Sequence, residues 1–409
     1  MISYSSKLRK ILDWVPVLAR MTRRPKLANL GIAATVLGAF LLTACTKDNT
    51  PPPTPLSTIV PHAIQISTLW SRQPTVGTDG EYFKLGSALY NNMLVTSGYH
   101  GKVALINPSN GNLIWETRLP GHTSAIPALN ADTIFIGTTD GTLYALSTQT
   151  GKIQWQVALP SLILGAPAAV SDAVVIQAHN STIEAFASDT GKMLWSSDNT
   201  SPNLSLYGNS SPLILNGTVY VGFDNGQMGA YDLYQGTETW QVPVAIPSSP
   251  DAVDNLVDLD GTPASDNGAI FATSYHGSLT ALNMQNGQVV WQKTLSSFEA
   301  PAIANNKIFV TDETGIVYAV DESTGQILWQ QKALQYRFVS APVIMNNTVI
   351  VGDYAGYVHF LAMNDGHELA RINVSSKGIR AAPIVYNNNT LIVSSNDGRV
   401  TALQIKGSQ

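Results

Sequence analysis

The sequence has almost no cysteine. Cys45 is the single cysteine among 409 residues, so no disulfide can form within the chain. No pair or cluster of cysteines offers metal ligands, and the spacing of the seven histidines does not suggest a metal site. The sequence therefore gives no indication of a structural metal or of a disulfide framework.

Basic residues are scarce outside the N-terminal region. The chain has 23 Lys and Arg against 28 Asp and Glu, a net charge of −5. Residues 1–44 contain seven Lys or Arg and one Asp, a net of +6, so the rest of the chain carries −5 − 6 = −11. Because phosphate binding needs a basic surface, this acidic body excludes nucleic acid as a partner. Apolar residues make up 44% and charged residues 12% of the chain, which favours a large buried core.

The longest apolar run lies near the N-terminus. A basic cluster at residues 23–26 precedes this run, which ends in small residues before Cys45. That order is typical of a bacterial secretory signal. Leu42-Thr43-Ala44-Cys45 also resembles a lipobox, whose cysteine is lipidated and becomes the mature N-terminus. The alternative is a retained membrane helix, because residues 27–44 are long enough to span a bilayer.

We therefore predict an N-terminal extension and lipoprotein signal peptide over residues 1–44, with lipidation at Cys45. Met21 is an alternative start. In proteobacterial lipoproteins, Thr46 in place of aspartate implies transfer to the outer membrane. This predicts a protein anchored by lipid in the inner leaflet of the outer membrane and facing the periplasm. Residues 45–62 are rich in proline and threonine, which predicts an extended tether after the lipidated cysteine.

Two residue types recur along the chain with a period of about forty residues. Tryptophans stand at positions 70, 115, 155, 195, 240, 291 and 329, and prolines at 127, 167, 212, 263, 301, 342 and 383. A shared period of this length is typical of a solenoid or a propeller. Each unit has four strand-like pieces joined by turn formers such as Asp140-Gly141 and Thr150-Gly151. Four antiparallel strands in forty residues predict one blade of a β-propeller.

Eight such units can be counted, and the last ends after its third strand. Trp70, upstream of the first full unit, is placed to supply the missing strand. We therefore predict an all-β fold, an eight-bladed propeller of four-stranded antiparallel blades over residues 63–409, closed by an N-terminal strand that removes open edges. The tryptophans should pack between neighbouring blades, and the prolines should lie on the innermost strands. The seventh unit alone has Ala370 where the pattern expects a tryptophan.

The units resemble the pyrroloquinoline-quinone propeller repeat, in which a Thr-Gly turn precedes the tryptophan of the fourth strand. This resemblance raises an alternative function, a pyrroloquinoline-quinone-dependent dehydrogenase. That family needs a calcium-holding carboxylate set and a catalytic aspartate, and it often has an adjacent cysteine pair, which this sequence lacks. The carboxylates here recur at the same surface turn of each unit, which indicates structure and not a paired acid and base. We therefore expect no enzyme, no catalytic residues, no cofactor and no metal.

Two connections between units are longer than the others, and function in repeat proteins usually lies where the repeat is broken. They run from Ser196 to Ser211, the first long loop, and from Pro243 to Gly261, the second long loop. Both join a fourth strand to the next first strand around the same unit, so we expect them to be neighbours on one face. They combine apolar side chains with aspartates, namely Leu204, Leu206, Tyr207, Leu256, Val257, Asp251, Asp254, Asp258 and Asp260. An apolar cluster rimmed by acid favours protein docking, and the alternative is a loop folded over its own blade.

Taken together, these features resemble a known family. The lipobox, the tether, the eight units and the segments LSLYG, DNLVDLDGTP, LQYRFVSAPV and VGDYAGYVHFLAMNDG are similar to the BamB family. Its members are lipoprotein subunits of the β-barrel assembly machinery, the BAM complex, of the outer membrane.

This resemblance implies a non-enzymatic scaffold that docks on the POTRA domains of BamA and assists insertion of outer-membrane β-barrels. Other BAM subunits and unfolded outer-membrane proteins are further candidate partners. The resemblance assigns the partner contact to Leu204, Leu206 and Tyr207 of the first long loop, and to Asp258 and Asp260 of the second. Tyr207 stands where the family has an arginine, which removes a positive charge from the expected contact but leaves an apolar ring and a hydroxyl.

Overall fold

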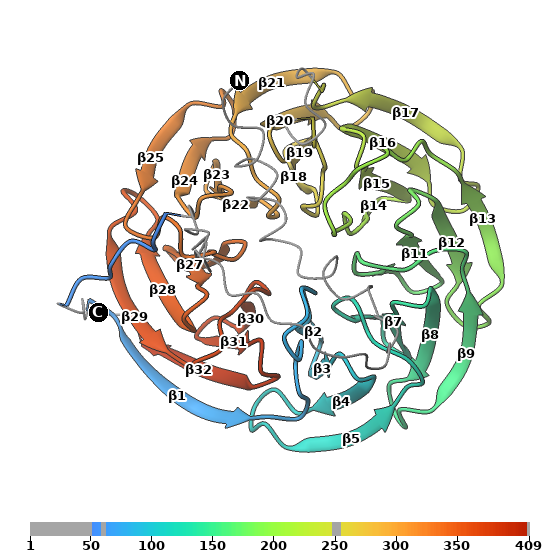
Figure 1. Ribbon diagram of the computed structural model, residues 1–409, viewed down its shortest axis with the longest axis horizontal. Coiled ribbons are helices and arrows are strands. Elements are labelled where there is room, and N and C mark those ends of the chain that lie inside the picture. Colours follow the sequence, from blue (N-terminus) through green and yellow to red (C-terminus); the bar gives the residue numbers. More distant parts are fainter. Residues whose placement is uncertain (1–50, 59–62, 248–254, 407–409) are drawn as a thin grey trace, which may run out of the picture. The chain divides into compact units, whose positions relative to one another are not determined.

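The computed structural model describes residues 51–58, 63–247 and 255–406. Strands and turns account for the secondary structure of these residues, and no described segment forms a helix that could cross a membrane. The predicted signal and the predicted lipidation residue Cys45 lie outside the described residues. From Pro53 onward the chain forms one compact unit, in which eight four-stranded sheets are arranged in a ring (Figure 1). The prediction of an eight-bladed propeller is confirmed.

The first four blades follow one another directly along the chain. Blade 1 contains β2 (Ser87–Tyr90), β3 (Met93–Ser97), β4 (Lys102–Ile106) and β5 (Leu113–Arg118). Blade 2 contains β6 (Ala128–Leu129), β7 (Thr133–Gly137), β8 (Thr142–Ser147) and β9 (Ile153–Ala158). Blade 3 contains β10 (Ala168–Ala169), β11 (Ala173–Gln177), β12 (Ile183–Ala187) and β13 (Met193–Ser197). Blade 4 contains β14 (Leu213–Leu215), β15 (Thr218–Gly222), β16 (Gln227–Asp232) and β17 (Glu238–Pro243).

The other four blades complete the ring, and the last one uses both ends of the described chain. Blade 5 contains β18 (Ala264–Asp266), β19 (Ala269–Thr273), β20 (Ser278–Asn283) and β21 (Val289–Thr294). Blade 6 contains β22 (Ala302–Ala304), β23 (Lys307–Thr311), β24 (Val317–Asp321) and β25 (Ile327–Gln331). Blade 7 contains β26 (Val343–Met345), β27 (Thr348–Gly352), β28 (Tyr357–Ala362) and β29 (Glu368–Asn373). Blade 8 contains β30 (Ile384–Asn387), β31 (Thr390–Ser394), β32 (Val400–Lys406) and β1 (Gln65–Arg72).

An N-terminal strand closes the ring, as predicted. β1 pairs antiparallel with β32 from Gln65 opposite Lys406 to Arg72 opposite Val400. This pairing satisfies the edge of β32 that would otherwise be open to another chain. The prolines of the repeat, such as Pro127 before β6 and Pro212 before β14, directly precede the innermost strands. An edge position suits proline because it has no backbone N–H to donate.

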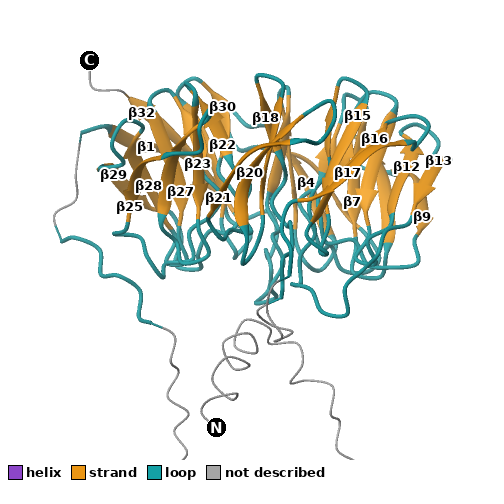
Figure 2. Cartoon of the chain, turned by 90° about the horizontal axis from the view of Figure 1, so that it is seen from above, coloured by secondary structure: helices purple, strands orange, loops and turns teal. Residues whose placement is uncertain are grey.

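The hydrophobic core lies between neighbouring blades. Side chains of β11 and β12 pack with those of β15 and β16 in one cluster, which includes Val175, Ile183 and Val221, all fully buried. Each such side chain removed from water stabilises the fold by roughly 1.5–3 kcal/mol. The strands run between two faces lined by loops (Figure 2). The rigid blades therefore position the loops that carry the candidate site.

Seven tryptophans connect neighbouring blades, as predicted. Each indole N–H donates to a backbone carbonyl of the following blade at 2.7–3.1 Å, in the pairs Trp70–Pro108, Trp115–Thr148, Trp155–Ser188, Trp195–Leu233, Trp240–Met284, Trp291–Glu322 and Trp329–Met363. The indole also covers a glycine in the turn between the third and fourth strands of that blade. A buried indole N–H needs such an acceptor, so tryptophan and turn form one unit.

The exception at Ala370 has a structural cause. A tryptophan there would face the turn between the third and fourth strands of blade 8. That turn does not exist, because β32 is followed in the sheet by β1 from the other end of the chain. The segment leading into β1 takes its place: Ala63 N donates to Leu369 O at 3.0 Å, and Ile64 and Ile66 pack in the cluster that contains Ala370.

Part of the predicted tether packs on the propeller. Thr54 N donates to Gln335 O at 3.0 Å, and Arg337 Nη1 donates to Thr54 O at 3.2 Å. Arg371 Nη2 donates to Ser57 O, and Leu56 packs against the apolar cluster between blades 6 and 7. The composition of residues 45–62 predicted an extended segment without packing, which is wrong for residues 54–57. Backbone carbonyls that accept from two arginines are a feature that composition does not reveal.

Candidate partner-docking site

The two long loops flank blade 4 and are joined to each other. The structure begins them after Ser197, where β13 ends, and after Pro243, where β17 ends. Leu206 N in the first long loop donates to Asp258 Oδ1 in the second at 2.8 Å. Burial, and after it the charge of Asp260, raises the pKa of Asp258 to about 8, so the acceptor is not a fully ionised carboxylate at neutral pH. The expectation that the loops are neighbours is confirmed; Asp251 and Asp254 lie outside the described residues.

Backbone hydrogen bonds fix the position of Asp258 between blades 4 and 5. Its carbonyl oxygen accepts from Tyr275 N of blade 5 at 2.9 Å, and Leu259 N donates to Phe223 O of blade 4 at 3.4 Å. The connection between blades 7 and 8 repeats this arrangement with Ile379 N and Asp353 O. The propeller therefore holds the backbone of this part of the second long loop.

The second long loop contributes less surface than the sequence suggested. Leu256 is 2% exposed, Val257 is 4% exposed and Asp258 is 0% exposed. The prediction that Leu256 and Val257 belong to an exposed apolar cluster is wrong, because both pack into the interior. Asp258 does not form part of an acidic rim. Its carboxylate faces the first long loop, so its direct effect is to hold Leu206.

The first long loop presents the exposed part of the site. Leu204 is 45% exposed and Tyr207 is 38% exposed, while Leu206 is half-buried. The Tyr207 ring lies 5.7 Å from the Phe83 ring and 6.0 Å from the His179 ring, measured between centroids. Burial raises the pKa of the Tyr207 hydroxyl, which stays neutral at physiological pH. The first long loop therefore exposes one apolar side chain, Leu204, and one uncharged aromatic side chain, Tyr207. The carboxylates of the site are buried.

Asp260 lies beneath the first long loop. A Cβ at Gly208 would come within 2.8 Å of Asp260 Oδ2, so glycine allows the loop backbone to approach the carboxylate. Burial raises the pKa of Asp260, and the positive charge of Lys84 opposes that rise. Lys84 itself forms an ion pair with Glu299 at 3.1 Å. The candidate residues are thus brought together, with Leu204 and Tyr207 on the surface and both aspartates set behind them.

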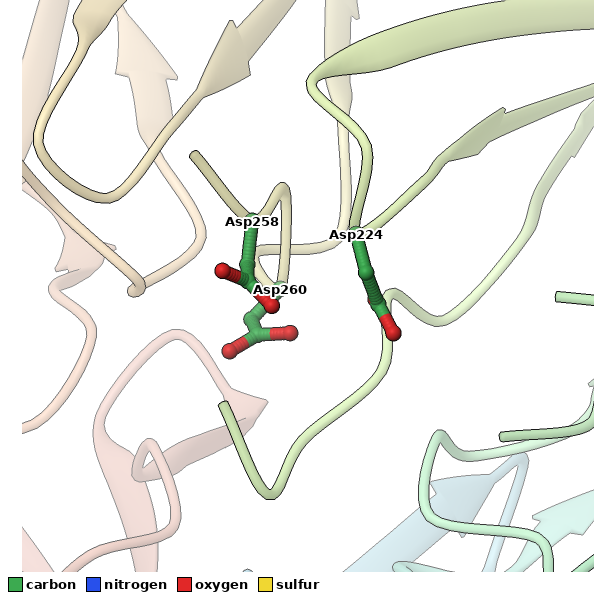
Figure 3. A group of neighbouring side chains, drawn as sticks. All are labelled: Asp224, Asp258 and Asp260. Atoms are coloured by element: carbon green, nitrogen blue, oxygen red, sulfur yellow. The ribbon is translucent and has the colours of Figure 1, made fainter. Parts of the chain in front are cut away.

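The structure adds Asp224, which the sequence analysis did not select. Asp224 lies in the turn between β15 and β16 and is 3% exposed. One oxygen from each of Asp224, Asp258 and Asp260 lies within 4.8 Å of the others (Figure 3). Burial raises the pKa of Asp224 well above its usual value, and the charges of Asp260 and Asp258 add to this rise. Aspartate is so common in these turns that its sequence position alone gave no signal.

The sequence and the described fold match a known protein family. The family model described as "Outer membrane protein assembly factor BamB" matches residues 99–331 and 314–408. The chain belongs to the BamB family. A solved structure of BamB from Moraxella catarrhalis has a TM-score of 0.75 and 26% identity, and it is matched over 83% of this chain and 100% of its own.

Curated relatives of this BamB-family chain carry the same family name. The outer membrane protein assembly factor BamB of Legionella pneumophila is 43% identical over 62% of this chain and 66% of its own length. That of Escherichia coli K12 is 37% identical over 64% of this chain and 70% of its own length. The Francisella tularensis relative is 41% identical, and the match spans 59% of its length. The chain thus matches slightly less than two thirds of the Legionella and Francisella proteins.

Dehydrogenases share the fold alone. A quinohemoprotein alcohol dehydrogenase from Pseudomonas putida has a TM-score of 0.65 at 13% identity, and a europium-containing methanol dehydrogenase has a TM-score of 0.69 at 12% identity. At these identities the likeness extends to the propeller and not to its chemistry.

Proposed function

We propose that this protein is a non-enzymatic scaffold of outer-membrane protein assembly. It is anchored in the outer membrane through lipidated Cys45, faces the periplasm and docks on the POTRA domains of BamA. There it assists the folding and insertion of β-barrel proteins together with other BAM subunits. The relatives are named outer membrane protein assembly factors, which supports a role in that process. The geometry of the two long loops supports docking on a partner.

One observation carries the docking proposal: the Leu206 N to Asp258 Oδ1 hydrogen bond holds the first long loop with Leu204 and Tyr207 exposed. Large apolar side chains held in a fixed position lose little conformational entropy on binding. Binding energy at protein interfaces concentrates in a few such anchors. Leu204 and Tyr207 are therefore the anchors of the proposed contact, with Leu206 beneath them.

The test is the affinity of the full-length protein in detergent for a purified tandem of POTRA domains, measured by calorimetry. Leu204→Ala combined with Leu206→Ala should weaken binding by at least about thirtyfold, since anchor truncation costs roughly 2 kcal/mol or more and 1.4 kcal/mol is tenfold. The matched control is Leu113→Ala combined with Ile114→Ala. These side chains are 51% and 53% exposed on β5, away from both loops.

The control should bind like the wild type. Equal affinity of the docking double variant, with an unchanged far-ultraviolet spectrum, would exclude this face as the contact. Loss of affinity in both double variants would show that the effect is not specific to the two long loops, which would contradict the proposed contact.

A further inference from the structure

Three carboxylates from two separate segments lie close together beneath the first long loop. Asp224 comes from the turn of blade 4, and Asp258 and Asp260 come from the second long loop across from it (Figure 3). Oxygen atoms of the three lie within 4.8 Å of one another. In the described part of the chain, no other three His, Cys, Asp or Glu side chains bring potential ligand atoms so close.

Asp224 is buried and aimed into this group without a protein partner. It is 3% exposed, and neither of its carboxylate oxygens accepts a hydrogen bond in good geometry, although the Ser205 hydroxyl lies near enough to lower its pKa slightly. Asp258 Oδ2, on a side chain that is 0% exposed, also lacks a partner. Buried polar atoms of native proteins are normally hydrogen-bonded, so unpaired carboxylate oxygens here call for a ligand.

Carboxylates in the equivalent turns of other blades are satisfied. Asp140 in blade 2 accepts from the Thr138 hydroxyl, and Asp397 in blade 8 accepts from the Ser395 hydroxyl. Glu313 in blade 6 accepts from the Ser296 hydroxyl at 2.6 Å. Counted from the turn glycine, Asp140 and Asp397 stand at the position of Asn225, and Glu313 stands at the position of Asp224. The comparison at the same position is therefore with Glu313, which has a partner where Asp224 has none.

The charge of the group is not balanced by the described side chains. The positive charge of Lys84 opposes the rise in the pKa of Asp260, but the ammonium group of Lys84 is paired with Glu299. No Lys, Arg or His among residues 63–247 and 255–406 forms an ion pair with Asp224, Asp258 or Asp260. An isolated carboxylate is costly to bury, and three together are more so.

In contrast to the sequence-based expectation of no metal, we propose that Asp224, Asp258 and Asp260 form a site for a divalent cation, with calcium as the preferred ion. Carboxylate oxygens are the ligands of hard cations, and Ca²⁺ binds oxygen at about 2.3–2.6 Å. Oxygens on opposite sides of one Ca²⁺ are therefore up to about 5 Å apart, so three oxygens within 4.8 Å of one another can bind the same ion. Mg²⁺ usually keeps several waters and binds through one or two carboxylates, so a set of three buried carboxylates favours Ca²⁺.

The bound cation joins the blade 4 turn to the second long loop. Asp258 would bind the ion through Oδ2, which has no protein partner, and keep Oδ1 for Leu206 N. One ion would thereby fix both long loops on blade 4. Affinity in the range of roughly 10⁻⁴–10⁻³ M is expected, as in extracellular calcium modules.

The experiment uses the full-length protein in detergent after removal of metal with a chelator. Calcium binding is measured by calorimetric titration. The thermal midpoint of unfolding is measured with and without about 10 mM calcium, a concentration on the order of ten times the weakest dissociation constant expected. The wild type should bind one Ca²⁺ per chain. Asp224→Asn, which keeps the shape of the side chain, should weaken binding at least about tenfold. Asp140→Asn in the sister turn is the control and should bind calcium like the wild type.

The thermal midpoints give a second readout that a merely structural role would not produce. Without metal, Asp224→Asn should unfold at a higher temperature than the wild type, because a neutral amide replaces a buried carboxyl that is costly to ionise. With calcium the order should reverse. Absence of binding to the wild type, or equal calcium affinity of wild type and Asp224→Asn, would overturn the proposal. Neither outcome depends on POTRA binding, so it is distinguishable from failure of the proposed function.

Discussion

Gly191 of blade 3 lies against the indole of Trp155 of blade 2. A Cβ built on Gly191 would lie 2.6 Å from two indole carbons, Cδ2 and Cε3. The backbone there also has φ of +69°, which side chains other than glycine rarely adopt. The Thr-Gly turn and the tryptophan of the repeat therefore recur together because each turn fits under the indole of the preceding blade.

Gly191→Ala should lower the free energy of unfolding by about 2–4 kcal/mol, from backbone strain of about 1 kcal/mol plus overpacking of about 1–3 kcal/mol. Gly217→Ala is the matched control, with φ of +77° and no atom within 4 Å of the added Cβ. It should show the strain alone. Chemical denaturation measures both, and equal losses would mean that contact with Trp155 adds nothing.

Much of this architecture could be predicted from the sequence, because the same residue types recur at the same positions of successive blades. Trp155, Gly151 and Pro167 each mark one position of a blade, and periodic marks of this kind define both the strand order and the blade count. The departure at Ala370 could be noticed but not explained. Its cause is the strand β1, which comes from the other end of the chain.

The candidate site was predictable only in part. Loop length identified the two loops, and the family resemblance selected Leu204 and Tyr207. The burial of Asp258 could not be foreseen, because a run of acidic residues in a long loop is usually solvated. Asp224 was missed because its role depends on a segment that lies more than thirty residues away in the sequence. A contact between a blade turn and a loop outside the repeat, unlike the repeated tryptophan contacts, has no signature in the local sequence.

A buried charged network in blade 7 predicts a pH-dependent stability. His359 Nε2 lies 3.2 Å from Asp353 Oδ2, and His359 Nδ1 lies 2.8 Å from Glu368 Oε1. Burial alone would lower the pKa of His359, but the two carboxylates outweigh it and raise this pKa above its usual value. Arg337 and Arg371 complete the network on the other side of these carboxylates.

A raised histidine pKa stabilises the fold fully below the unfolded-state value of about 6.5 and loses this effect as pH rises through the folded-state pKa. His359→Gln should therefore cost roughly 3 kcal/mol at pH 6 and clearly less at pH 9. His367→Gln is the control, because that histidine is exposed and pairs only with exposed Asp365; its effect should stay within about 0.5 kcal/mol at both pH values. A penalty for His359→Gln that grows with pH would contradict the assignment of a charged His359.

Lipidation at Cys45 predicts a specific processing defect. Cys45→Ala removes the thiol that would accept the lipid in the proposed anchoring, so the protein should persist as an unprocessed or mislocalised precursor. Membrane fractionation and mass spectrometry of the N-terminal peptide measure this. Cys45→Ala that is processed and recovered with the outer membrane like the wild type would disprove lipidation at this residue.

The hydrogen bond between the two long loops predicts how Asp258 contributes to partner binding. Asp258→Ala leaves Leu206 N without its acceptor, and an unsatisfied buried donor costs about 1–3 kcal/mol. POTRA binding should therefore weaken roughly tenfold. Asp258→Asn keeps an acceptor oxygen and should retain most of the affinity, when both are measured with chelator present to exclude any effect of calcium.

Because Asp258 is fully buried, the loss in Asp258→Ala should hardly change between 50 mM and 500 mM salt, concentrations that span Debye lengths of roughly 14 Å and 4 Å. An exposed aspartate that met a basic group of the partner would instead lose its effect at high salt. Equal weakening by Asp258→Ala and Asp258→Asn, decreasing as salt is added, would show that the carboxylate contacts the partner directly. The expected pattern of tolerance to asparagine and indifference to salt assigns Asp258 to the positioning of Leu206, and leaves Leu204 and Tyr207 as the side chains that the partner meets.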